Sequence, residues 1–226
     1  RTTSEKQKPK KKPRFVAPVM ASHSSSQEVK LKNYTIIVLD DISGKEILQR
    51  LEIDGLNKIL ITVTFKEGYT LLNKPLEPVR NSACVPNGVM FYAHWLQGST
   101  NYYFLNLANL SVSLLPVIHQ LFTEPTRVVC FEVQAVYMLL LDVFRLQDTS
   151  DWFAFDPLVG CWLLDPDNPV TNFAEVLKKL DMNVDLLVVN CKADVQTQAC
   201  DLLPVLDIAM DVLQKRLLSA ALWTVF

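Results

Sequence analysis

A dense run of cations is one group of residues whose type and spacing suggest a chemistry. Five positive charges fall within residues 8–14, on Lys8, Lys10, Lys11, Lys12 and Arg14, and two prolines keep this stretch extended. Such a cluster is typical of a nuclear-localisation signal or of a patch that binds nucleic-acid phosphates. The alternative is a solvated linker, but the density and sharp boundaries of the cluster favour the nuclear interpretation.

The charge of the chain is divided between this tail and the remainder. Residues 1–32 carry nine Lys or Arg and two Glu, whereas the other residues carry 13 basic and 22 acidic groups. The tail is also rich in Ser and Pro and poor in large apolar residues, so it cannot bury enough surface to fold alone. We therefore expect a disordered basic tail over residues 1–32 and a folded, acidic domain over residues 33–226. An acidic domain is a poor stand-alone ligand for DNA.

Histidine and cysteine residues do not predict a metal centre. The three histidines are isolated, and the five cysteines form no CxxC pair, which fits reduced, buried thiols in an intracellular protein. No apolar run approaches the roughly 18 residues needed to cross a bilayer. The sequence starts at Arg1 without a signal-peptide pattern, so we expect a piece of a longer or processed polypeptide.

Residues 155–169, FDPLVGCWLLDPDNP, place three aspartates around a short apolar segment. Asp156-Pro157 is a favourable helix start, because proline at the first helical position lacks only an N–H that would be unpaired. The following residues are almost all apolar, which predicts a helix buried on most faces. The residues from Asp165 onward then form an exit turn. Asp156, Asp165 and Asp167 are accordingly interpreted as cap and turn residues.

The remaining patterns predict an α/β fold with a mixed sheet. Strands come first as a meander, and strands and helices then alternate. We expect strands at residues 34–40, 58–65, 88–95, 101–107 and 127–131. We expect further helices at residues 45–53, 111–122 (with Ser111 or Ser113 as cap), 133–144, 173–180 and 199–218. Residues 86–88, Pro-Asn-Gly, suggest a hairpin turn, and residues 186–189 an extended piece.

The order of these elements and three segments together resemble a known family. The segments are FDPLVGCWLLDPDNPVTNFAEVL, RVVCFEVQAVYMLLL and the LW-x-VF ending. They are similar to the 3′–5′ exonuclease-like domain of family A DNA polymerases over roughly residues 34–226. The resemblance implies a ribonuclease H-like 3′–5′ exonuclease fold, a mixed sheet flanked by helices. It also implies a parent DNA-directed DNA polymerase, a nuclear nucleotidyltransferase that acts in DNA repair, the DNA-damage response and translesion synthesis.

Active nucleases of that family hold two divalent metals with four carboxylates. Their pattern is Asp-x-Glu on the first sheet strand, an Asp on the helix after a later strand, and Tyr-xxx-Asp on the last long helix. In this sequence Thr62, Thr64 and Phe65 stand where the first acids belong, and Val136 aligns with the next. Hard cations such as Mg²⁺ need several oxygen ligands close together. The resemblance therefore predicts a pseudo-nuclease, with no catalytic and no metal-binding residues in this chain.

One candidate carboxylate remains on the last helix. Asp201 aligns with the final acid of the pattern, and Thr197 replaces the tyrosine. Asp201 is a possible residual carboxylate, although a helix-start acid in a favourable dipole position is the preferred interpretation. A single carboxylate cannot hold two Mg²⁺ ions against their hydration.

The chain also lacks the palm carboxylates and the cationic helix that a polymerase needs. Polymerase activity, its Mg²⁺ and its DNA partner are thus expected of the parent protein, and no cofactor is expected here. Repair-factor proteins are further possible partners, and no membrane association is expected. Two alternatives stay open: an active metal-dependent 3′–5′ exonuclease with atypical ligands such as Glu67, Glu132 and Asp201, or a free-standing protein-interaction domain.

Overall fold

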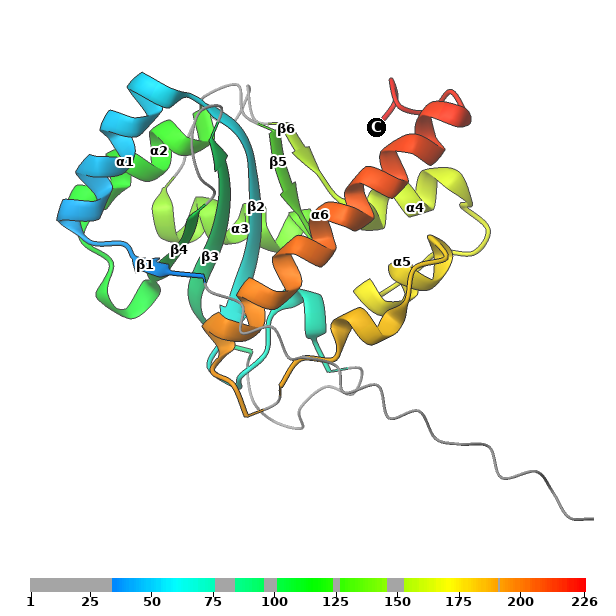
Figure 1. The fold of residues 1–226 in the computed structure, drawn as a ribbon, viewed down its shortest axis with the longest axis horizontal. Helices are drawn as coiled ribbons and strands as arrows, with labels where there is room; N and C mark the ends of the chain where they lie inside the picture. Colours follow the sequence, from blue (N-terminus) through cyan, green and yellow to red (C-terminus); the bar gives the residue numbers. More distant parts are fainter. Residues whose placement is uncertain (1–33, 76–83, 96–100, 124–126, 146–152, 191) are drawn as a thin grey trace, which may run out of the picture. The chain divides into compact units, whose positions relative to one another are not determined.

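The β-branched and aromatic runs of the sequence form one mixed sheet of six strands in the part of the chain that the structure describes (Figure 1). This computed structural model describes residues 34–75, 84–95, 101–123, 127–145, 153–190 and 192–226. The strands are β1 (Ile36–Val38), β2 (Leu56–Phe65), β3 (Pro86–Trp95), β4 (Asn101–Asn106), β5 (Arg127–Cys130) and β6 (Phe153–Phe155). Their order across the sheet is β1-β4-β3-β2-β5-β6.

Strand β2 lies in the middle of this order and joins two kinds of pairing. It pairs antiparallel with β3, which pairs antiparallel with β4, so these three strands form a meander. On its other side β2 pairs parallel with β5, and β5 pairs parallel with β6. Strand β1 adds to the far edge, parallel to β4. The prediction of an α/β fold with a mixed sheet flanked by helices is confirmed.

Helices cover both faces of the sheet. They are α1 (Asp41–Asp54), α2 (Leu115–Thr123), α3 (Val133–Phe144), α4 (Pro157–Leu164), α5 (Phe173–Lys179) and α6 (Val195–Ser219). Figure 1 shows α6 lying across one face, and on that face Lys58 of β2 reaches Asp207 of α6. Alternate residues of a strand point to opposite faces, and Ile59 accordingly packs near Ile47 of α1 and Leu121 of α2.

Aspartate caps explain why two helices begin earlier than predicted. The Asp40 carboxylate accepts hydrogen bonds from the backbone N–H groups of Ile42 and Ser43, so α1 begins at Asp41. The Asp194 carboxylate accepts the N–H of Thr197, so α6 begins at Val195. The predicted bounds of α3, residues 133–144, are confirmed.

The predicted hairpin turn at residues 86–88 is wrong, because these residues lie inside β3. Gly88 pairs with Thr64 of β2, and a Cβ atom at this position would lie 2.3 Å from the ring of Phe104. The glycine is therefore needed for a close approach of neighbouring strands and not for a turn.

Two further predictions differ from the structure, and one strand was not predicted. The first half of the extended piece predicted at residues 186–189 belongs instead to a 3₁₀ turn, Val184–Leu187, whereas Val188 has an extended backbone. The predicted helix at residues 111–122 is divided into a 3₁₀ turn, Val112–Leu114, and α2, and Ser111 makes no side-chain capping bond. Strand β6 was not predicted, because three residues carry too little pattern to distinguish a strand from a loop.

The basic tail with Lys8, Lys10, Lys11, Lys12 and Arg14 lies outside the described residues. Within the described ranges, no helix combines the length and the apolar character needed to span a bilayer.

Candidate functional site

The first nuclease-like positions lie on β2 and are packed as core. Thr62 and Thr64 are 1% and 0% exposed, on the face that α6 covers. The Thr64 hydroxyl donates to Oδ1 of Asn87, whereas the Thr62 hydroxyl has no hydrogen-bond partner among the described residues. Phe65 is also buried and stacks on Tyr69. This strand offers no oxygen-rich surface to a cation.

The next nuclease-like position is also apolar. Val136 is buried within α3, which packs beside α2 on the face opposite α6. The His119 ring of α2 bonds to the carbonyl of Phe144 at the end of α3, which ties these two helices together. Val136 therefore contributes to packing and supplies no ligand atom.

Asp201 is not a helix-start acid, so that interpretation is wrong. Helix α6 is capped by Asp194, and Asp201 lies beyond its first turn. Burial, followed by the negative charge of Asp201, raises the pKa of Tyr34, whose hydroxyl donates to the Thr197 carbonyl at 3.4 Å. Asp201 thus lies within electrostatic reach of the tyrosine that precedes β1.

The atypical ligands of the alternative nuclease are dispersed. Glu67 is exposed in the turn after β2, and the Glu132 carboxylate lies 3.4 Å from the Lys74 ammonium. In the parts of the chain that the structure describes, no three His, Cys, Asp or Glu side chains gather as a possible metal site. The structure therefore does not bring Glu67, Glu132 and Asp201 together.

A different carboxylate, Asp156, has the most unusual surroundings of the predicted cap residues. Its side chain accepts the N–H of Leu158 through Oδ1 and the N–H of Val133 through Oδ2, both at 2.8 Å. The first bond caps α4, as predicted, and the second gives a hydrogen-bond acceptor to the first backbone N–H group of α3. One side chain, which is 2% exposed, therefore joins the N-termini of two helices.

Burial has a large effect on the acidity of Asp156. Burial away from water raises its pKa to about 6, although the two backbone hydrogen bonds by themselves lower the pKa. Glu132 raises the pKa slightly further by like-charge repulsion. Glu132 itself has a φ of 55°, in the left-handed region that non-glycine residues rarely adopt, and it makes the sharp turn from β5 into α3.

A groove of about 490 Å³ lies between α3 and α4 next to Asp156. It is lined by Glu132, Val133, Gln134, Ala135, Met138, Asp156, Leu158 and Val159. The prediction that α4 is buried on most faces is confirmed only in part. Val159 and Trp162 are 41% and 50% exposed. The other residues of the helix are buried or packed against the core. Only the face of α4 with Gly160 and Cys161 is fully buried, and a Cβ atom on Gly160 would lie 2.4 Å from Leu213 of α6.

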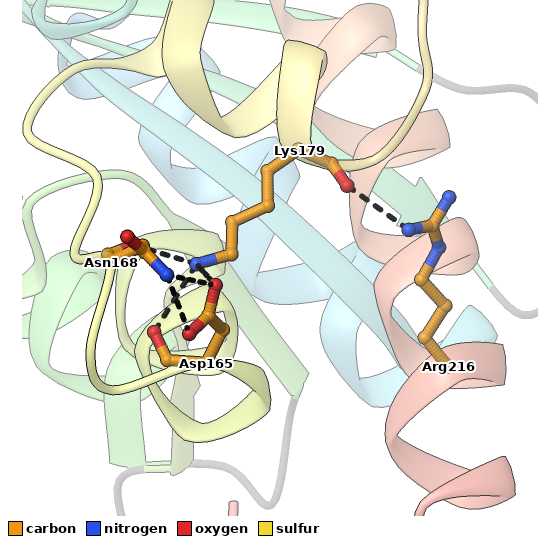
Figure 2. A network of polar contacts seen from close by, with 4 residues as sticks. All are labelled: Asp165, Asn168, Lys179 and Arg216. Atoms are coloured by element: carbon orange, nitrogen blue, oxygen red, sulfur yellow. Dashed lines mark hydrogen bonds and ion pairs between the residues drawn. The ribbon is translucent and has the colours of Figure 1, made fainter.

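A polar network holds the far end of α4 (Figure 2). The Lys179 ammonium donates to the carbonyls of Asp165 and Asn168 at 3.2 and 2.7 Å, and it pairs with the Asp165 carboxylate at 3.2 Å. Arg216 of α6 donates to the Lys179 carbonyl at 3.0 Å, and to that of Leu180 at 2.8 Å. Lys179 thereby connects α5 to the exit turn of α4, and Arg216 connects α6 to the end of α5.

A second hollow, of about 320 Å³, lies where residues 71–75 approach the start of α5. Its lining includes Lys74, Glu132 and Asn172, and Asn172 caps α5 by accepting the N–H of Glu175. Glu132 lines both this hollow and the α3–α4 groove. The two hollows are therefore neighbours on either side of Glu132, which lies just after β5.

Sequence reasoning identified Asp156 as a helix cap but missed both its second helix and the groove. The Asp-Pro step signals one helix start, whereas the bond to Val133 joins residues that are far apart in the chain. No family model matches the chain, and no curated protein shows significant similarity to it.

Proposed function

We propose that this chain is the non-catalytic, exonuclease-like module of a nuclear DNA-directed DNA polymerase that acts in DNA repair and translesion synthesis. Its role is that of a scaffold or interaction domain, and Mg²⁺ and DNA belong to the parent enzyme. The observation that carries the proposal is the burial of Thr62 and Thr64 where the resemblance places Asp-x-Glu. Among family A polymerases, the quoted segments resemble the vertebrate polymerases nu and theta, and nu is the preferred comparison.

The topology supports this proposal. A meander of β2, β3 and β4 that is extended beyond β2 by parallel strands fits the ribonuclease H-like layout that the resemblance implies. The chemistry agrees with an inactive site, because hydroxyl and apolar groups replace carboxylates that would repel one another without metal. We infer that the scaffold was kept while the metal ligands were lost.

A nuclease assay tests the non-catalytic part. We expect the purified chain to remove no nucleotides from a 3′-labelled single strand in Mg²⁺ or Mn²⁺. Metal-dependent loss that disappears in Asp201→Ala and persists in Asp211→Ala would overturn the proposal. Both residues lie on α6, so Asp211 is a matched control for a change of charge on this helix.

The parent polymerase is tested by the coding sequence downstream of Phe226. Polymerase palm motifs in the same reading frame would support the proposal, and a stop codon in the genomic continuation would favour a free-standing interaction domain. In the tail, replacing Lys10, Lys11 and Lys12 with alanine should move a tagged full-length protein out of the nucleus. Unchanged nuclear localisation would contradict the signal interpretation.

A further inference from the structure

Strand β6 forms an open edge of the sheet (Figure 1). It is the last strand in the sheet order and pairs with β5 on one side. An edge strand presents N–H and C=O groups that point away from the sheet. Among the described residues, no backbone hydrogen bond joins β6 to any segment other than β5. The outer side of β6 can therefore accept the backbone of a further strand.

Aromatic side chains gather beside this edge, where the C-terminal turn after α6 packs on β6. The ring centroid of Phe155 lies 5.4 Å from that of Trp223, with the planes 4° apart, and 5.6 Å from that of Phe226. Phe153 is two residues before Phe155, so both side chains point to the same face of the strand. Phe153 is 64% exposed, and the aromatic surface therefore continues to the open edge.

Arg127 lies on this aromatic surface without an acidic partner. It pairs in register with Phe153, and its guanidinium lies over the rings of Phe155 and Trp223, 5.2 and 5.9 Å from their centroids. Among the described residues, no carboxylate forms an ion pair with Arg127 and no acceptor takes a hydrogen bond from it. The two rings therefore position the guanidinium, while its N–H donors remain available to a carboxylate.

These residues define an edge patch with one positive charge. The edge patch consists of Arg127, Phe153, Phe155, Trp223 and Phe226, and it contains no acidic residue. Because the guanidinium already lies over a ring of β6, it is about one strand spacing, roughly 5 Å, from a strand added beyond β6. An aspartate or glutamate on an added strand can therefore reach Arg127.

The backbone and the charge together distinguish between classes of ligand. A peptide backbone supplies both donors and acceptors at the spacing of a strand, as the open edge requires. A nucleic-acid backbone supplies phosphate acceptors and would meet only one cation in the edge patch. A second copy that pairs its β6 with this β6 would bring a second Arg127 and no carboxylate from its own edge patch.

The end of β6 is held in place by the residue that follows it. Asp156 comes directly after β6 and accepts the N–H groups of Val133 and Leu158 at the starts of α3 and α4. A strand that is already ordered loses less conformational entropy when a ligand binds.

We propose that the open edge of β6 binds an extended segment of a partner protein as an added strand. An aspartate or glutamate of that segment pairs with Arg127, and an apolar side chain packs on Phe153. The inference deepens the interaction role proposed above and rests on it. Its measurement is peptide binding by this chain, so its failure is distinguishable from a failure in the nuclease assay or in the coding sequence downstream of Phe226.

Selection from a displayed library of random peptides on the full chain tests this partner class. We expect enriched peptides to combine β-branched or aromatic residues with Asp or Glu. The most enriched peptide, synthesised with a fluorescein label, is then the probe for measurements of fluorescence anisotropy. Phe153→Ala should weaken its binding by about tenfold. Ile42→Ala is the matched control, because Ile42 is 71% exposed on α1, outside the edge patch, and should leave binding unchanged.

The acidic residue of the peptide is tested with Arg127→Met, which keeps a long unbranched side chain and removes the charge. This variant should weaken binding severalfold and reduce its dependence on salt. Lys45→Met is the matched control, because Lys45 is exposed on α1, and binding should be unchanged. Thermal unfolding followed by circular dichroism checks that each variant is folded.

Strand addition itself is tested by N-methylation of the peptide backbone, which removes one N–H group at a time. Alternate residues of a strand bond to the same neighbour. We therefore expect methylation at every second residue to weaken binding by about tenfold and methylation at the residues between them to have little effect. Binding that is insensitive to methylation at all positions would contradict an added strand.

Other outcomes would also overturn the proposal. They are enrichment of no peptide, enrichment of peptides without an acidic residue, and wild-type affinity in both Phe153→Ala and Arg127→Met. Binding of a single-stranded oligonucleotide that is lost in Arg127→Met, without peptide binding, would identify a nucleic acid as the occupant instead. Dimerisation of the chain in sedimentation experiments that is lost in Phe153→Ala would identify a second copy.

Discussion

Two Asp-Pro steps bracket helix α4, and their aspartates have opposite surroundings. Asp156, at the start, is 2% exposed, and burial raises its pKa to about 6. Asp165, at the end, has a side chain that is 40% exposed, and hydrogen bonds from Lys179 and Asn168 lower its pKa. The same dipeptide therefore gives one carboxylate that resists ionisation and one that favours it.

The difference shows what each carboxylate does for the fold. Asp156 accepts hydrogen bonds from backbone N–H groups of two helices at a position that water scarcely reaches. Water therefore cannot take over these hydrogen bonds if the carboxylate is removed. Asp165 interacts with the Lys179 and Asn168 side chains near solvent, where ion pairs contribute little. We therefore expect burial and the number of backbone hydrogen bonds, and not the Asp-Pro motif, to determine how much each aspartate contributes to the free energy of unfolding.

The largest effect is expected from removal of the buried carboxylate. Asp156→Ala should lower the free energy of unfolding by about 3 kcal/mol, because two buried N–H groups lose their acceptor. Chemical denaturation followed by circular dichroism measures this value. Asp165→Ala is the matched control, and equal losses in the two variants would contradict the comparison.

A pH titration tests the raised pKa of Asp156. Its folded-state pKa of about 6 exceeds its ordinary value of 3.8, so the folded state binds the proton more tightly than the unfolded state. The stability from this group is complete below about pH 4 and is lost as the pH rises through about 6, by at most about 3 kcal/mol. Asp165, with its lowered pKa, has the opposite sign, and its contribution is lost as the pH falls.

The titration compares the wild-type chain with Asp156→Asn, whose side chain has no titratable proton. The stability difference between them should change in favour of the variant as the pH rises from 4 to about 7. A difference that stays constant over this range would show that Asp156 titrates normally.

The smallest effect is expected at the exposed end of the helix. Asp165→Asn should change the free energy of unfolding only slightly, because the lost ion pair is screened by solvent. Lys179→Met should cost more, about 1 kcal/mol, since it removes donors to two backbone carbonyls. Lys178→Met is the matched control, because Lys178 is exposed on the same helix. A larger loss of stability in Asp165→Asn than in Lys179→Met, measured by chemical denaturation, would show that the ion pair contributes more than the hydrogen bonds to the two carbonyls.

Much of the fold could be predicted where the signal is local. The strand run of β2 and the bounds of α3 follow from β-branched content and apolar periodicity within a few residues. Gly88 shows the limit, because a Pro-Asn-Gly sequence usually marks a turn. Here the ring of Phe104 on the neighbouring strand β4, which leaves no room for a Cβ atom, decides the role of this glycine.

The candidate site also has some properties that follow from the local sequence and others that depend on tertiary contacts. The sequence by itself determined that acids are absent at Thr62, Thr64 and Val136, because residue identity needs no structure. It also determined that Asp156 starts a helix, since capping is a local interaction between near neighbours. Only the tertiary structure decided that Asp156 also holds α3, that its pKa is raised, and that Val159 faces an open groove. These properties depend on solvent exclusion and on contacts between residues far apart in the chain, which no local pattern encodes.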